Sequence, residues 1–327
     1  MNKPPSVLLV GCGRWGINHL RVLLRFHAAG RCRLVGVQDF SEQRLKDVAK
    51  EFGVKTFSDS RGMLEADAVD IVVPTYNHYK VAREALLAGK HILVEKPMTQ
   101  TSKEARELEK LKLKSGRIVM VGHLFRYNPA ADMARKLIVD KELGALRFLR
   151  GRFMGFRFQE HDAGILATTA IHFIYLSNYL MGKRPVAVWA KTERMLGTKL
   201  DDLSLIRLDY GSSFSLLESD YFTPGKWRTF DIIGTQGSLF VDLLNQELDL
   251  HRKRHVRVGE RYEAYDGGVV HRKLEFKEPL ELEISHFLKC VQDRSDPVTG
   301  ITDGLDTVKL VEAAYQSARS GKTIKLK

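Results

Sequence analysis

Residues 7–16 read VLLVGCGRWG, an apolar run followed by three glycines. The apolar run predicts a buried strand, and Gly11, Gly13 and Gly16 follow it in the pattern GxGxxG. Leucines and a valine at helical spacing continue from there until Gly30. Glycines between a strand and a helix permit a tight turn and let the backbone approach a pyrophosphate at the helix N-terminus. This stretch therefore predicts the first turn of a dinucleotide-binding fold.

A second predicted strand, CRLVGVQD, ends in Asp39. An acidic residue at this place accepts hydrogen bonds from the adenosine ribose hydroxyls and repels a 2′-phosphate. Asp39 therefore favours NAD over NADP, whereas the nearby Arg44 leaves NADP open as an alternative. Arg14 and Trp15, inside the glycine pattern, are further predicted cofactor contacts.

Strand and helix patterns alternate up to His123. After the second strand, further strands are predicted at 68–75, 91–95 and 117–123, and helices at 41–52, 77–87 and 101–115. Such alternation implies a parallel sheet with both faces covered. We expect residues 1–123 to form this dinucleotide-binding, or Rossmann, domain.

The remaining residues, 124–327, have a different pattern. Several long strands with partial alternation predict an antiparallel sheet with one open face. They lie at 146–158, 186–194, 203–210, 213–222, 228–235, 237–244 and 247–251, with helices at 129–141, 168–180, 280–293 and 303–320. The basic cluster HRKRH at 251–255 predicts a solvated hairpin. The expected fold class is therefore α/β, with a second α+β domain for substrate binding and oligomerisation.

Composition narrows the class of protein. The chain has 327 residues, 44% of them hydrophobic, and a net charge of +12 from 52 basic and 40 acidic residues. The basic residues are mostly scattered and match no nucleic-acid motif, so the excess charge favours a ligand that carries phosphates. Three cysteines give neither a disulfide framework nor metal-ligand spacing. We expect a cytoplasmic protein without a metal, because no apolar run suits a signal peptide or a membrane span.

A loop motif follows the strand predicted at 68–75. It contains Pro74, Thr75, Asn77 and His78. Ligands of open parallel sheets bind outside the carboxyl ends of the strands, so these four residues are predicted cofactor contacts. Asn77 is also a candidate cap of the following helix.

The next strand, HILVE, delivers Glu95 and Lys96 to the same edge of the sheet, followed by Pro97. The pair is suited to holding the nicotinamide ribose, and Lys96 is also placed to face the substrate. The positive charge of an oxidised nicotinamide favours the neutral amine, which can act as a base. The alternative is a surface ion pair at a strand end, which contributes little.

The sequence resembles the Gfo/Idh/MocA oxidoreductases over nearly its whole length. It contains, in the order found in that family, GCGRWG, VDIVVPTYNH, GKHILVEKP, VGHLFRYNP and DGLDTVKLVEAAYQSARSGKTIKL. The resemblance implies an enzyme that moves hydride between NAD(P) and a sugar, cyclitol or related alcohol, with Lys96 as its catalytic residue. Arg126 and Asn128 are then further substrate candidates.

The resemblance also implies an Asp-x-x-x-His motif on a later helix. This chain has Thr168 and His172 there, so His172 matches the second catalytic residue and both residues are predicted to meet the substrate. Threonine cannot serve as a carboxylate, and Tyr175 occupies the next position that is usually acidic. This departure from the pattern leaves open a non-catalytic sensor of NAD or sugar.

Residues 220–250 resemble the nucleotide-sugar branch of the family, which oxidises the 3-hydroxyl of UDP-N-acetylglucosamine or its uronic acid. Lys226 and Arg228 would meet phosphates in that branch, whereas the alternative treats TPGK as a plain hairpin turn. A free sugar or a cyclitol stays open as the substrate. The open sheet face predicts a homodimer or homotetramer.

Overall fold

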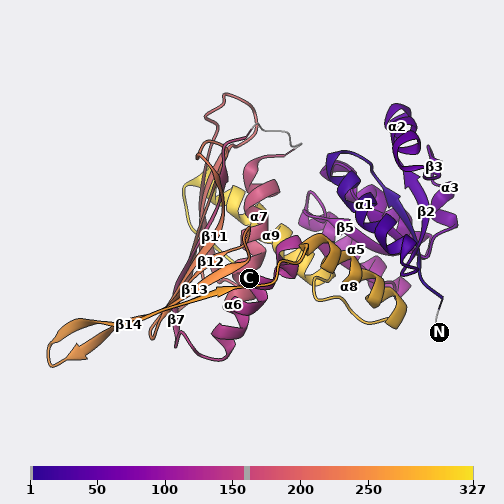
Figure 1. Cartoon of the computed structure of the whole chain (residues 1–327). Helices are drawn as coiled ribbons and strands as arrows, with labels where there is room; N and C mark the ends of the chain where they lie inside the picture. Colours follow the sequence, from indigo (N-terminus) through magenta and orange to yellow (C-terminus); the bar gives the residue numbers. More distant parts are fainter. Residues whose placement is uncertain (1–2, 158–162, 327) are drawn as a thin grey trace. The chain divides into compact units, whose positions relative to one another are not determined.

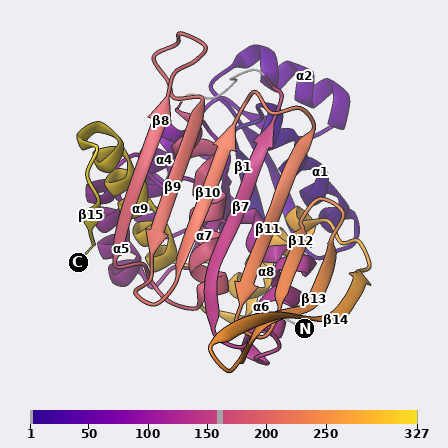
Figure 2. The same cartoon turned by 90° about the vertical axis from the view of Figure 1, so that its left-hand side faces the viewer.

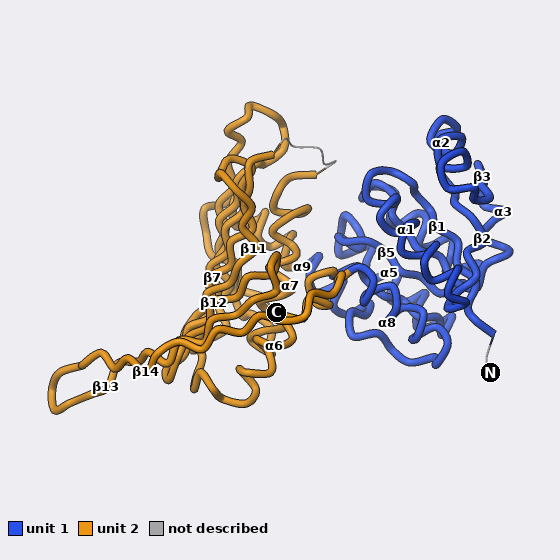
Figure 3. Tube along the Cα trace, viewed as in Figure 1, with its two compact units in different colours: residues 1–123, 280–309 blue, residues 124–279, 310–327 orange. Residues whose placement is uncertain are grey.

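The computed structural model describes residues 3–157 and 163–326. Its chain forms two compact units (Figure 3). The first unit comprises Met1–His123 and Leu280–Lys309, and the second comprises Leu124–Pro279 and Leu310–Lys327. The chain thus returns to the first unit after it has built most of the second.

A six-stranded parallel sheet forms the centre of the first unit (Figure 1). Its strand order is β3-β2-β1-β4-β5-β6. The strands are β1 (Ser6–Val10), β2 (Arg33–Gln38), β3 (Thr56–Phe57), β4 (Ala68–Ile71), β5 (His91–Glu95) and β6 (Val119–Gly122). Every residue of β1 and β4 is buried, as expected for strands covered on both faces. The predicted parallel sheet of a Rossmann fold is confirmed.

Helices cover this sheet, and most of them lie close to their predicted positions. They are α1 (Arg14–Ala28), α2 (Glu42–Phe52), α3 (Arg61–Leu64), α4 (Thr75–Leu87), α5 (Ser102–Ser115), α8 (Pro279–Asp293) and the first part of α9 (Ile301–Ser320). Ser41 caps α2, and Thr101 forms a capping box with Glu104 at α5. The expected cap at Asn77 is wrong, because α4 begins at Thr75 and its N-cap is Pro74.

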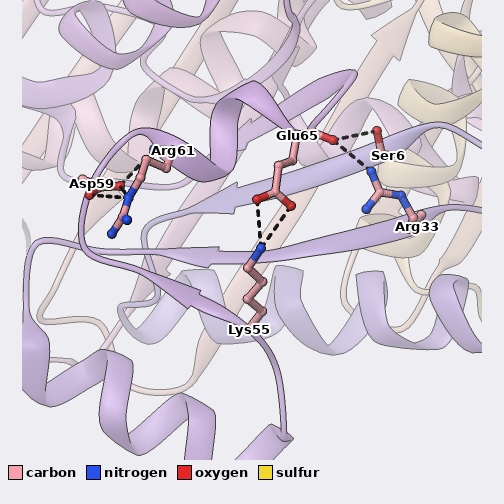
Figure 4. A network of polar contacts seen from close by, with 6 residues as sticks. All are labelled: Ser6, Arg33, Lys55, Asp59, Arg61 and Glu65. Atoms are coloured by element: carbon pink, nitrogen blue, oxygen red, sulfur yellow. Dashed lines mark hydrogen bonds and ion pairs between the residues drawn. The ribbon is translucent and has the colours of Figure 1, made fainter.

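Polar contacts fasten the segment around Glu65, between α3 and β4, to the neighbouring strands (Figure 4). The carboxylate of Glu65 accepts two bonds from Lys55, at 2.9 and 3.0 Å, and its backbone carbonyl accepts one from Arg33 at 2.9 Å. Arg61 pairs with Asp59 close by. Exposed ion pairs of this kind contribute about 0–1 kcal/mol each, so the stability of the unit depends mainly on its buried core.

A nine-stranded, mostly antiparallel sheet forms the second unit, as predicted (Figure 2). Its order is β14-β13-β12-β11-β7-β10-β9-β8-β15, and only the pair β7 and β10 is parallel within it. The strands are β7 (Leu146–Gly155), β8 (Ala187–Glu193), β9 (Leu203–Asp209), β10 (Phe214–Asp220), β11 (Lys226–Gly234), β12 (Ser238–Asp242), β13 (Glu247–Val258), β14 (Arg261–Lys273) and β15 (Ile324–Lys325).

Helices cover one face of this sheet. They are α6 (Pro129–Val139), α7 (Ile171–Met181) and the end of α9, whose apolar residues join one core with those of the strands. Phe173 of α7 packs on Phe230 of β11, with ring centroids 4.4 Å apart. The other face exposes Leu205, Leu216 and Trp227.

The basic cluster at 251–255 lies on a hairpin, as predicted. This hairpin is much longer than predicted, because β13 continues to Val258 and β14 was not predicted. The alternative of a TPGK hairpin turn is wrong, because β7 lies between β10 and β11 in the sheet.

No helix in the described part of the chain combines the length and apolarity that a membrane crossing requires.

Candidate active site

The glycine loop between β1 and α1 is shaped by close backbone packing. A Cβ on Gly11 would lie 2.4 Å from the carbonyl oxygen of Val72, and one on Gly16 would lie 2.1 Å from that of Gly11. Gly11 also has a φ of 100°, which disfavours any other residue. A Cβ on Gly13, by contrast, would have no atom closer than Nη1 of Arg44, at 3.9 Å. The loop therefore leaves its backbone open beside the N-terminus of α1, as a bound pyrophosphate requires.

Asp39 is fixed next to this loop at the end of β2. Its Oδ2 accepts a bond from the backbone N–H of Cys12 at 2.8 Å, and its Oδ1 accepts one from that of Ser41 at 2.9 Å. Arg44 approaches the same carboxylate at 4.0 Å. Burial, together with the charge of Asp39, raises the pKa of the Cys12 thiol to about 12, so Cys12 is a packing residue and not a nucleophile. The glycine loop and Asp39 together fit the adenosine half of NAD.

The residues after β4 differ in exposure. Pro74 is exposed, Thr75 is buried and Asn77 is half-buried. His78 is buried, with Nδ1 2.7 Å from the carbonyl oxygen of Pro97 and Nε2 2.8 Å from that of Val73. His78 thus connects the loop after β4 to the loop after β5. It positions the segment that carries Lys96.

The predicted pair at the end of β5 meets the first turn of α1. The indole N–H of Trp15 donates to Oε1 of Glu95 at 2.9 Å, and the backbone N–H of Lys96 donates to Oε2 at 3.1 Å. Lys96 is half-buried, and its bond to Pro97 is cis. The structure therefore brings Trp15, Glu95 and Lys96 together beside the glycine loop.

Behind Glu95 lies a buried ion pair that the sequence analysis missed. Nδ1 of His19 lies 2.8 Å from Asp70, and its Nε2 lies 3.3 Å from Glu95. Burial opposes protonation of His19, but the charge and hydrogen bond of Asp70, with a smaller effect of Glu95, raise its pKa to about 10. The imidazolium and the Lys96 charge in turn outweigh burial and lower the pKa of Glu95. An available signal was that His19 is a polar residue three positions after the glycine pattern, on the core-facing side of α1.

Two more buried titratable groups lie near Glu95. Burial lowers the pKa of His123, at the end of β6, to about 3, so its imidazole is neutral beside Glu95 and Lys96. Glu283 of α8 is fully buried, and neither carboxyl oxygen has a hydrogen-bond partner among the described residues. Burial, and then the negative charge of Glu95, raises the pKa of Glu283 well above its usual value. We infer that Glu283 is protonated at neutral pH.

Replacing Glu283 with glutamine is expected to make the protein more stable than wild type at pH 8, because glutamine keeps the size of the side chain and has no proton to lose. The folded state holds the Glu283 proton at pH values where the unfolded chain has released it. Stability therefore falls as pH rises above the unfolded pKa near 4.5, and glutamine removes this loss. Urea unfolding between pH 5 and 8 measures the effect, with Glu51→Gln at an exposed position of α2 as the control. A Glu283→Gln variant that is less stable at pH 8 would show that the carboxylate is needed in its ionised form.

In the second unit, the ring of His172 on α7 packs against two aromatic rings. Phe125 meets it edge-on at 5.2 Å between centroids, and Phe153 stacks on it at 5.6 Å and 24°. His172 is half-buried. Thr168 lies in the π-helical segment Leu166–Ala170 that precedes α7, where the sequence predicted one continuous helix. Its hydroxyl donates to the carbonyl of Gly164 at 3.0 Å, a bond that an aspartate carboxylate could not donate.

Two predicted substrate residues make contacts inside the second unit. Arg126 pairs with Asp132 and stacks over Tyr179, with its guanidinium carbon 4.1 Å from the ring centroid. Asn128 is buried, caps α6 through Ala130 and donates its amide to the carbonyl of Leu243 at 2.8 Å. Asn128 therefore has a structural role, because it caps the N-terminus of α6 and connects it to Leu243.

Both parts of the chain match known protein families. Residues 6–123 match the domain described as "Oxidoreductase family, NAD-binding Rossmann fold", and residues 145–326 match "Oxidoreductase family, C-terminal alpha/beta domain". The chain belongs to the Gfo/Idh/MocA oxidoreductase family. The glycine loop, Asp39 and the Glu95–Lys96 pair thus lie in the NAD-binding domain of this family.

Several named dehydrogenases align with this chain over almost their full length. Scyllo-inositol 2-dehydrogenase (NAD(+)) of Bacillus subtilis is 28% identical over 97% of this chain and 95% of that protein. UDP-N-acetylglucosamine 3-dehydrogenase of Acidithiobacillus ferrooxidans is 30% identical over 92% of this chain and 94% of that protein. A solved structure of the latter enzyme superposes with a TM-score of 0.82 at 25% identity, covering 97% of this chain and 98% of that one. Levoglucosan dehydrogenase in complex with NADH and L-sorbose has a TM-score of 0.85 at 21% identity, with 100% of both chains covered, which shows the shared fold.

Proposed function

We propose that the protein is an NAD-dependent dehydrogenase that oxidises a hydroxyl group of a sugar or nucleotide sugar. The placement of Lys96 carries this proposal. Lys96 follows Glu95 at the carboxyl end of β5, and Trp15 ties that Glu95 to the glycine loop. An amine held at the cofactor edge of a Rossmann sheet is well placed to take a proton from a substrate hydroxyl.

The remaining roles follow from the chemistry of each group. When bound, NAD supplies the acceptor for the hydride that leaves the hydroxyl-bearing carbon. Lys96 accepts the hydroxyl proton, and Glu95 holds the Lys96 backbone through Oε2. His172 donates or accepts a hydrogen bond at the substrate. Thr168 keeps its local contact with Gly164 and does not replace a carboxylate in this reaction.

The substrate is proposed to be a UDP-sugar, with a free sugar or a cyclitol as the second candidate. The printed activities of the relatives support both candidates, since one relative acts on a UDP-sugar and another on an inositol. NADH formation, followed by near-ultraviolet absorbance with a panel of UDP-sugars, free sugars and inositols, tests the proposal. Turnover with one class identifies the substrate. NAD binding without turnover of any sugar would instead support a sensor that has lost its catalytic carboxylate.

We also propose a cytoplasmic homodimer or homotetramer. The support is the uncovered face of the second sheet, where Leu205, Leu216 and Trp227 are each more than a third exposed, at 36%, 37% and 38%. Phe148 and Phe214 stack with centroids 5.4 Å apart on the same face. An exposed apolar sheet face is typical of an interface between subunits.

Replacing Asp39 with asparagine is expected to lower the preference for NAD over NADP by roughly 10–100-fold, which corresponds to about 1.4–2.8 kcal/mol. The single amide oxygen can still accept a bond from one of the two N–H groups, of Cys12 or Ser41, but the side chain no longer repels a 2′-phosphate. The ratio of kcat/KM for the two cofactors measures the change. Adding Arg44→Ala should remove part of the gained NADP activity, because Arg44 lies 4.0 Å from Asp39. An unchanged ratio in Asp39→Asn would show that Asp39 does not discriminate between the cofactors.

A further inference from the structure

His19 occupies a buried position on α1, next to the strand end that carries Glu95 and Lys96. Its Nδ1 lies 2.8 Å from Oδ2 of Asp70 on β4, and its Nε2 lies 3.3 Å from Oε1 of Glu95 on β5. Asp70 and Glu95 are buried as well. The imidazole of His19 thus lies between two carboxylates, and one of them belongs to the residue that precedes the candidate base.

The charges in this cluster are fixed by its geometry. His19 is an imidazolium at neutral pH, because Asp70 and Glu95 outweigh the effect of burial on its pKa. Glu95 is ionised, because His19 and Lys96 outweigh the effect of burial on its own pKa. The other titratable groups that face this place from neighbouring elements are uncharged: the imidazole of His123, at the end of β6, and the protonated carboxyl of Glu283 on α8.

The place of Lys96 conflicts with its proposed role as a base. An ordinary lysine has a pKa of about 10.4, so it holds its proton at neutral pH. An adjacent carboxylate such as Glu95 favours the charged ammonium further, whereas a base must be free of its proton when the substrate arrives. A positive charge beside that carboxylate has the opposite effect, because it offsets the negative potential at the lysine. His19 supplies such a charge.

We propose that His19 is a positioning residue of the reaction: its imidazolium, held by Asp70, offsets the charge of Glu95, so that Lys96 releases its proton at the working pH. Glu95 then keeps its bonds to Trp15 and to the backbone of Lys96 without holding the proton on the lysine. The released proton goes to solvent, since Lys96 is only half-buried. This inference rests on the proposed dehydrogenase function and adds to it a buried residue that acts through Glu95.

The pH dependence of kcat/KM tests the role of His19. With saturating NAD and the best sugar of the panel, kcat/KM of the wild type should rise with pH until Lys96 has lost its proton. His19→Gln removes the imidazolium and keeps a polar side chain. In this variant the rise should move to higher pH by about one pH unit, which lowers kcat/KM about 10-fold at any pH below the rise. A rise at the same pH as in the wild type would overturn the proposal, because lost stability alone does not move it.

Glu283→Gln is the matched control. It alters a buried group of the same cluster but leaves the charge of the cluster unchanged at neutral pH, because Glu283 is protonated there. The pH profile of kcat/KM in this variant should therefore coincide with that of the wild type. An equal shift in Glu283→Gln and His19→Gln would assign the effect to disturbed packing and would overturn the role of the His19 charge.

A direct titration of Lys96 needs no turnover. The lysines of the full chain are given isotope-labelled methyl groups, which keep their charge, and NMR follows the signal of Lys96 as the pH is changed. The signal is assigned by its absence in Lys96→Arg. We expect Lys96 of the wild type to lose its proton at lower pH than the exposed Lys103 in the same sample, and Lys96 of His19→Gln to lose it at higher pH than in the wild type.

This titration separates the inference from the proposed function. If no sugar is turned over but Lys96 titrates as expected, the role of His19 stands and the dehydrogenase function fails. If a sugar is turned over but Lys96 titrates at the same pH in wild type and His19→Gln, the function stands and the role of His19 fails. Should His19→Gln not fold, the wild type alone decides, since titration of Lys96 at or above the pH of Lys103 would overturn the proposal.

Discussion

Replacing Lys96 with alanine should lower kcat by roughly 10²–10⁴-fold, the usual contribution of a positioned acid or base. The variant should bind NAD within a few-fold of wild type, because the glycine loop, Asp39 and Trp15 are unchanged. Lys96→Arg should be nearly as inactive, since a guanidinium keeps the positive charge but cannot act as a base near neutral pH. Single-turnover kinetics and a separate NAD titration measure the two effects.

A second lysine in the same unit serves as the control for the general effect of removing a positive charge. Lys103 is exposed on α5 in the same unit, and Lys103→Ala should have wild-type kcat. Near-normal turnover in Lys96→Ala would exclude Lys96 as the base. Loss of NAD binding together with activity would assign Lys96 to cofactor binding instead.

Replacing His19 with alanine should destabilise the protein by about 3–5 kcal/mol, the usual cost of removing one partner from a buried ion pair. His19 is fully buried and lies between the carboxylates of Asp70 and Glu95. Without its charge, both carboxylates stay buried, close together and poorly compensated. Urea unfolding at pH 6.5 measures the loss. His27→Ala, an exposed position on the same helix, is the control and should change little.

The pH dependence of this stability difference shows whether it arises from the charge of His19. The folded pKa of His19 is raised to about 10 from an ordinary 6.5, so its stabilisation is fully present below 6.5 and is lost as pH rises towards 10. The difference between wild type and His19→Ala should therefore shrink at high pH. A double variant with Asp70→Ala should lose less than the sum of the two single variants, because both act on one interaction. A difference that is constant from pH 6 to 10 would mean that His19 contributes packing and not charge.

The pattern of the first unit was predictable because its signals are local. A strand followed by GxGxxG and a helix, Asp39 at the next strand end, and the caps at Ser41 and Thr101 depend on residues close in sequence. Gly16 illustrates the physical reason, since no other residue fits 2.1 Å from the Gly11 carbonyl. The sheet of the second unit was predictable for a similar reason, because alternation along single strands records which face is buried.

The buried titratable groups around the candidate catalytic residues could not be predicted from local sequence patterns. His19, Asp70, Glu95 and Glu283 come from four separate elements, and only the packing of α1 and α8 on the parallel strands makes them one buried network. Arg228 faces the helices, and not the open side, because the register of β11 against β7 places it opposite Phe153.

The sequence by itself determined the family, most of the helices and strands, and the position of Glu95 and Lys96 at the end of β5. The tertiary structure decided which charges are buried and which of them have partners. Burial and charge pairing depend on distances between segments that are far apart in the chain, and these distances set the protonation of His19 and Glu283.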